Sequence, residues 1–146
     1  RMPNFSRTVT VSSDIDSSFV FLSDFRNLEK WAEGDEGELI TKEPLRQGSV
    51  FKVKTHFNSK PREYDYEIVE WGPPLRVSLQ ASTSIFTIVD TIFLSANSKG
   101  TEVTYSVDIK YKFPFFILGI FVGTIFNKIM DEQIKNLEAV LGPVQG

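Results

Sequence analysis

The chain has no cysteine and only one histidine, His56. The lack of cysteine excludes disulfide bonds and thiolate metal sites, and it leaves the redox compartment open. His56 alternates with Lys52 and Lys54 along a strand-like stretch, so we expect it on the polar, solvent-exposed face of that strand. From these absences the sequence predicts no metal ion and no cofactor.

The chain also lacks an excess of positive charge and the short motifs of common catalytic sites. It carries 16 Lys and Arg against 19 Asp and Glu, a net charge of −3 without a basic stripe, so nucleic acid is not an expected partner. It has no Gly-rich phosphate loop, no nucleophile elbow and no Cys/His pair. The carboxylates of Glu33–Glu38 lack the spacing of a calcium loop, which predicts a solvated turn. The sequence leaves enzyme activity undecided and favours a binding protein.

A hydrophobic run long enough to cross a membrane is also missing. The uncharged run Phe113–Phe126 is 14 residues long, whereas a spanning helix needs about 20. We therefore expect a buried helix, in which Gly119 and Gly123 allow close approach or a bend. Its apolar side chains occupy all faces, so the surplus is expected to meet the ligand, a second copy of the chain or a membrane surface. The polar start of the chain has no signal-peptide core, and we expect a cytoplasmic location.

Regular periodicity is what the chain does contain. Its 146 residues predict one domain spanning 1–146. Two short helices are expected after the first strand, with Ser13 as the N-cap of the first, and a long amphipathic helix at about 114–141. Many antiparallel strands and one long helix indicate the α+β class, with a curved sheet wrapped on that helix. Alternation of apolar and polar residues predicts strands near 5–11, 37–43, 49–57, 62–71, 75–81, 85–95 and 102–111.

Four stretches in order along the chain carry a resemblance to a known superfamily. They are "FLSDFRNLEKW", "LRQGSVFKVKTHF", "YEIVEWGPPLRVSLQ" and "KGTEVTYSVDI". Together with the terminal helix they resemble the START/polyketide-cyclase (SRPBCC) superfamily over nearly the whole chain. The resemblance implies a helix-grip fold, in which a seven-stranded antiparallel sheet grips the last helix and usually encloses an apolar cavity.

Asp90 is the polar residue whose position points to chemistry. It shares a strand face with Ile88 and Ile92, which by parity is the inward face, and the next hairpin places it near Val107 and Tyr105. A carboxylate there has a raised pKa unless a cation reaches it, which makes Asp90 a candidate for ligand recognition or proton transfer. Two alternatives stay open: a β-bulge that turns Asp90 outward, and a purely structural hydrogen bond to a tyrosine.

The resemblance implies a ligand cavity lined by inward strand residues and the terminal helix. We expect it to hold a small hydrophobic or amphipathic ligand, such as a lipid, an isoprenoid or a polyketide-like compound. A cyclase/dehydratase-like enzyme using Asp90 and a cavity tyrosine, and a membrane-peripheral lipid carrier using Phe113–Phe126, are the alternatives. The candidate cavity residues are Trp31, Phe51, Val53, Phe57, Tyr64, Tyr66, Leu79, Asp90, Ile92, Tyr105, Ile109, Ile120, Thr124 and Met130.

Overall fold

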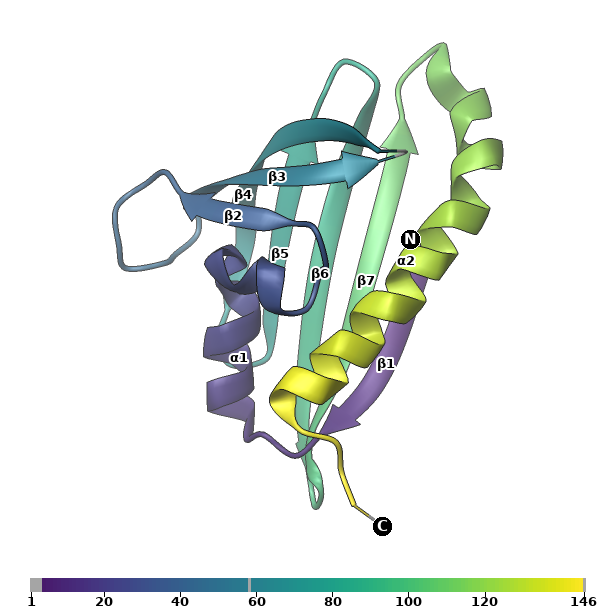
Figure 1. Cartoon of the computed structure of the whole chain (residues 1–146). Coiled ribbons are helices and arrows are strands. Elements are labelled where there is room, and N and C mark those ends of the chain that lie inside the picture. The colour runs from purple at the N-terminus through teal and green to yellow at the C-terminus, as the bar shows by residue number, and fades with distance from the viewer. Residues whose placement is uncertain (1–3, 58, 146) are drawn as a thin grey trace.

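The computed structural model describes residues 4–57 and 59–145, with the side chain of Phe57 outside the described part. Within these residues seven strands form one antiparallel sheet in the order β1-β7-β6-β5-β4-β3-β2, which bends around the last helix (Figure 1). This is the α+β helix-grip arrangement that the sequence predicts. The strands are β1 (Phe5–Val11), β2 (Glu36–Leu39), β3 (Val50–Phe57), β4 (Lys60–Gly72), β5 (Arg76–Ser82), β6 (Phe86–Asn97) and β7 (Gly100–Tyr111).

The first helix, α1 (Ile15–Ser23), is capped one residue later than the sequence predicts. The Asp14 side chain, not Ser13, accepts a hydrogen bond from the Ser17 backbone N–H at 2.8 Å. A carboxylate at this position satisfies one of the free N–H groups of the first turn and also favours the positive end of the helix dipole. The cap turns α1 back over the sheet, with Phe19 and Leu22 buried against it.

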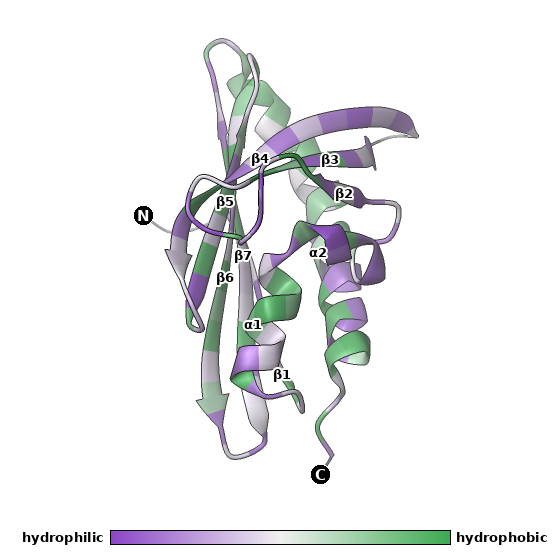
Figure 2. Ribbon diagram, turned by 90° about the vertical axis from the view of Figure 1, so that its left-hand side faces the viewer, coloured by the Kyte–Doolittle hydropathy of each residue, from purple (hydrophilic) through white to green (hydrophobic). Residues whose placement is uncertain are grey.

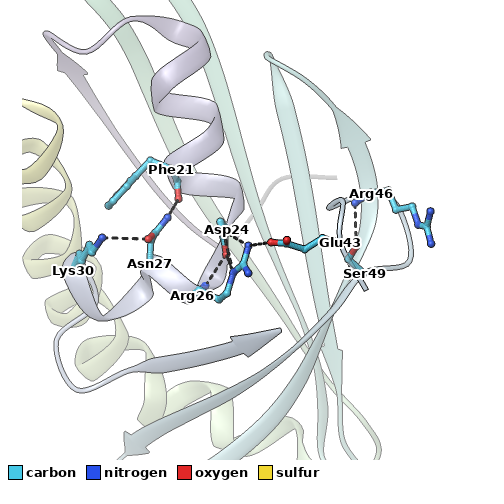
Figure 3. Close-up of polar contacts among 8 residues, drawn as sticks. All are labelled: Phe21, Asp24, Arg26, Asn27, Lys30, Glu43, Arg46 and Ser49. Carbon is cyan, nitrogen blue, oxygen red and sulfur yellow. Dashed lines mark hydrogen bonds and ion pairs between the residues drawn. The ribbon is translucent and has the colours of Figure 1, made fainter. Parts of the chain in front are cut away.

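A short 3-10 helix, η1 (Phe25–Lys30), follows α1 and is held from both sides (Figure 3). The Arg26 guanidinium forms ion pairs with Asp24 and with Glu43 of the β2–β3 loop, each at 2.8 Å. Asn27 donates a side-chain hydrogen bond to the Phe21 carbonyl at 3.0 Å. These contacts fix η1 between α1 and the edge of the sheet, so that its apolar side chains point into the interior.

The last helix, α2 (Leu118–Leu141), begins after the short 3-10 turn η2 (Phe115–Ile117). Its apolar stripe packs on the sheet, with Met130 and Leu137 fully buried. Arg7 of β1 ties the helix down, because its guanidinium pairs with Asp131 at 2.7 Å and donates to the Asn127 side chain at 2.9 Å. None of the helices in the described part of the chain is long and apolar enough to cross a membrane.

Candidate ligand-binding cavity

A cavity of about 710 Å³ lies between the sheet, η1 and α2. Its volume is within the range of small-molecule sites, and its lining is largely aromatic and aliphatic. Strands β3, β4, β6 and β7 supply one wall, and a single stripe of α2 supplies the other. The apolar lining residues are Phe25, Leu28, Val53, Ile85, Phe86, Ile88, Ile109, Leu118, Val122, Phe126 and Ile129.

The cavity opens between the β3–β4 hairpin and α2. The exposed residues that line it mark this opening: Glu33 before β2, His56, Arg62 and Glu63 on β3 and β4, and Leu118 and Glu132 on the helix. Charged side chains therefore surround much of the opening, whereas the first turn of α2 contributes the apolar side chain of Leu118. A ligand that enters here passes from a polar rim to an apolar interior.

Asp90 lines the cavity from β6, an interior strand of the sheet. Asp90 is only 6% exposed, and its Oδ2 accepts a hydrogen bond from the Tyr105 hydroxyl at 2.9 Å. Oδ1 has no hydrogen-bond partner among the described residues. Burial raises the pKa of Asp90 to about 7, and the hydrogen bond from Tyr105 only partly opposes this effect. The carboxyl group can therefore lose or gain a proton near neutral pH.

The β5-β6-β7 ladder decides between the two structural alternatives for Asp90. Asp90 pairs with Leu79 on one side and Val107 on the other without a shift of register. The β-bulge that would turn it outward is absent from this part of the sheet, and the predicted inward orientation is correct. The tyrosine hydrogen bond does exist, since Tyr105 donates to Asp90 across the β6–β7 pair.

Three more polar residues contribute to the cavity wall: Tyr66, Asp35 and Gln133. Burial raises the pKa of Tyr66, and the nearby Asp90 charge adds to the rise. Asp35 accepts a hydrogen bond from Thr55 at 2.5 Å, and burial raises its pKa despite that bond. Gln133 Oε1 is buried without a partner among the described residues. The prediction of a solvated turn is correct for Glu33, Glu36 and Glu38, which are exposed, but wrong for Asp35, which is partly buried and hydrogen-bonded to Thr55 of β3.

A family comparison matches nearly the entire chain. Residues 2–142 match the family model described as polyketide cyclase/dehydrase and lipid transport. The chain belongs to this family. No sequence among the curated proteins matches it.

Several solved structures have the same fold as this family member, although their sequences are only distantly similar. Protein CV1439 from Chromobacterium violaceum is 18% identical, with a TM-score of 0.68, over 97% of this chain and 99% of that one. A START superfamily protein from Mycobacterium smegmatis is 13% identical, with a TM-score of 0.77, over 94% and 95%. The di-domain ARO/CYC StfQ from the steffimycin biosynthetic pathway is 8% identical, with a TM-score of 0.72, over 94% and 49%. The family model and these neighbours together give a polyketide cyclase-like domain with the helix-grip fold.

The cavity of this family member contains some of the residues that the sequence singles out. The candidates that line it are Val53, Tyr64, Tyr66, Asp90, Tyr105 and Ile109. The candidates that are buried in the packed core without lining it are Trp31, Phe51, Leu79, Ile92 and Met130. Alternation along a strand tells which face points inward, but not whether side chains or open space lie above that face. The side chain of Phe57 lies outside the described residues.

The candidates on α2 are displaced from the cavity by rotation about the helix axis. Ile120 is 76% exposed and Thr124 is also exposed. The lining residue Val122 lies two positions from each, and two residues turn a helix by about 200°. The stripe that does line the cavity is Leu118, Val122, Phe126, Ile129, Gln133 and Asn136. Its spacing of three and four residues is a sequence signal for this face, and Gln133 and Asn136 are its polar residues that the candidates do not include.

Trp31 supports the cavity from outside its wall. Its ring packs edge-on against Tyr105, with ring centroids 5.2 Å apart and an interplanar angle of 89°. This contact holds the Tyr105 ring in the position from which its hydroxyl reaches Asp90. No group of three or more His, Cys, Asp and Glu side chains in the described residues is placed to hold a metal ion.

Proposed function

We propose that this domain binds one small amphipathic molecule, with its apolar body in the cavity and a hydrogen-bond donor, such as a hydroxyl group, at Asp90. The observation that carries the proposal is the cavity of about 710 Å³ with largely apolar walls and a buried carboxyl group inside it. Burying roughly 300 Å² of apolar ligand surface would contribute about 7 kcal/mol before ordering costs. Lipid, isoprenoid and polyketide-like molecules that carry a hydroxyl group have this chemistry.

The polar groups explain how such a ligand would be oriented. Asp90 Oδ1 is an acceptor that no described residue uses, and the Tyr66 hydroxyl also belongs to the wall. A buried acceptor without a partner costs free energy, so a ligand donor that reaches it restores a hydrogen bond worth about 1–3 kcal/mol. An apolar molecule without a donor fills the same space but leaves the carboxyl group unpaired.

Proton transfer is a second candidate function, and the pKa of Asp90 is the observation that favours it. A general acid or base works best when its pKa lies near the operating pH, and burial places that of Asp90 at about 7. The Tyr105 hydroxyl, whose own pKa is raised by burial, already donates to it. A cyclase/dehydratase-like reaction would use this pair to move a proton to or from the bound ligand.

The binding proposal predicts that filling the cavity weakens ligand binding. Val122→Trp places a larger side chain in the cavity wall, and we expect the affinity for a polarity-sensitive dye, anilinonaphthalene sulfonate, to fall by about tenfold or more. Oleyl alcohol should displace the dye from the unmodified protein. Fluorescence titration measures both effects.

The matched control is Val140→Trp on the same helix, because Val140 is 43% exposed and does not line the cavity. It should leave dye affinity within about twofold of the original. Equal dye affinity in both variants would show that the dye binds elsewhere and would overturn the proposal.

A further inference from the structure

A cluster of large apolar side chains is exposed at the start of the last helix. Figure 2 shows these first turns in green, whereas the later turns of α2 alternate between green and purple. Five of the side chains are at least 60% exposed, which is far more than scattered single residues on a normal surface. The sequence leads us to expect this helix to be covered on all faces, but the chain itself covers only one. We call this cluster the apolar patch; it consists of Phe113, Phe116, Ile117, Leu118, Ile120, Phe121 and Ile125.

The charges that flank the apolar patch along the chain are all positive. Lys110, Lys112 and Lys128 flank it, and no Asp or Glu occurs anywhere from 109 to 130, although the whole chain has a net charge of −3. None of these lysines forms an ion pair with a described residue. Lys112 is held at the patch by hydrogen bonds from its ammonium group to Ser82 and to the Thr83 carbonyl. The patch is therefore a hydrophobic surface with a cationic border.

The cationic border favours an anionic bilayer over a second copy of the chain. In a two-fold dimer the same surface would face itself, so the three lysines of one copy would lie near those of the other. Like charges brought together in this way oppose association. An anionic lipid surface provides apolar volume for the phenylalanines and isoleucines and negative headgroups for the lysines.

We propose that the apolar patch inserts into the surface of an anionic phospholipid bilayer. The η2 turn and the first turns of α2 then lie at the level of the headgroups, with the lysines among the phosphates. Leu118 belongs both to the patch and to the cavity wall, so the bilayer would meet the cavity opening. If the cavity holds an amphipathic ligand, as proposed above, that ligand could pass between bilayer and cavity with little exposure to water.

The test is co-sedimentation with phospholipid vesicles in the absence of any added cavity ligand. We expect the chain to bind vesicles of phosphatidylcholine mixed with phosphatidylglycerol. Its affinity for pure phosphatidylcholine vesicles should be lower by about tenfold or more. The double variant Ile120→Glu/Phe121→Glu should lose binding to both kinds of vesicle. Lys110→Gln/Lys128→Gln should remove the preference for phosphatidylglycerol, because each lysine near an anionic surface raises the binding affinity about fivefold.

The matched control is Val20→Glu/Leu75→Glu, which places two acidic residues at exposed apolar positions outside the patch. Val20 lies on α1, away from η2 (Figure 1), and both residues are more than half exposed. This variant should bind vesicles as the original chain does.

Three outcomes would overturn the docking proposal. These are no vesicle binding by the original chain, equal losses in the patch and control variants, and a dimer in sedimentation velocity that Ile120→Glu/Phe121→Glu dissociates. If the original chain binds the dye but not the vesicles, docking alone is refuted. If Val122→Trp and Val140→Trp bind the dye equally well, the ligand proposal alone is refuted.

Discussion

Between pH 5 and pH 8 the original chain is expected to lose about 3 kcal/mol of folding free energy that the variant Asp90→Asn does not lose. The folded-state pKa of Asp90 is about 7, compared with 3.8 for the free side chain. The folded chain therefore binds this proton more tightly than the unfolded chain does. The stabilising contribution is fully present below pH 3.8 and is lost as the pH rises through about 7. The folded-state pKa lies roughly two pH units above pH 5, and each unit corresponds to about 1.4 kcal/mol.

Asn removes the titration while retaining an oxygen that can accept the Tyr105 hydrogen bond. Its amide group brings new donors, and leaving them unpaired would lower stability by about 1–3 kcal/mol at every pH. The pH-dependent difference between the two proteins is consequently more informative than either stability alone. Urea unfolding of both proteins at pH 5 and pH 8 measures it.

Asp65→Asn is the matched control, because Asp65 is an exposed carboxylate on β4. It removes the same charge from the surface and should not produce the difference between pH 5 and pH 8. Asp35 is present in all three proteins; its pKa is also raised by burial, and its charge adds to the raised pKa of Asp90. If Asp90→Asn and the original chain show parallel pH profiles, Asp90 does not carry a raised pKa in the folded protein.

The same variant distinguishes the three roles of Asp90. Lost turnover with unchanged ligand affinity would identify a general acid or base, because only the proton-transfer step is removed. Ligand binding weakened by about 1–3 kcal/mol would identify a carboxyl group that recognises the polar end of the ligand. Unchanged binding combined with higher stability would identify a structural acid whose burial is costly.

A second large effect is expected for Gly37→Ala, with a loss of about 3 kcal/mol or more in folding free energy. A Cβ at position 37 would lie well under 3.0 Å from the Phe25 carbonyl oxygen, closer than real Cβ contacts. The obstacle is backbone of η1, which cannot move aside as a flexible side chain could. Relief requires β2 and η1 to separate, and overpacking of this kind costs at least 1–3 kcal/mol.

The cavity should respond to the same change. Phe25 and Leu28 of η1 line it, so their displacement would weaken dye binding as well as stability. Gly123→Ala is the matched control, because nothing lies within 4 Å of a Cβ there and the residue is inside a helix. It should stabilise the protein by about 0.5–1 kcal/mol. Thermal unfolding of both variants measures this contrast, and equal stability would contradict the close β2–η1 packing.

The secondary-structure elements, their order and the inward orientation of Asp90 follow from local patterns in the sequence. Period-two alternation in β6 places Asp90 and Ile88 on one face, and hairpin pairing with β7 follows from the short connection between the strands. The buried stripe of α2 was also readable, since Met130 and Leu137 lie at helical spacing. These features depend on neighbours within a strand, a helix or one hairpin, and local patterns record such neighbours directly.

Where the interior is packed and where it is open depends on how the elements pack against one another. Leu79 and Tyr66 both face inward, yet Leu79 is enclosed by other side chains and Tyr66 lines the cavity. In the sequence Asp35 looks like a surface carboxylate. In the structure it is partly buried and accepts a hydrogen bond from Thr55 of β3. The rotation of α2 about its own axis, which turns Val122 toward the cavity and Ile120 outward, depends on the packing of its later turns against β1. Such outcomes depend on contacts between residues far apart in the chain, and a one-dimensional pattern contains no record of the distance between its elements.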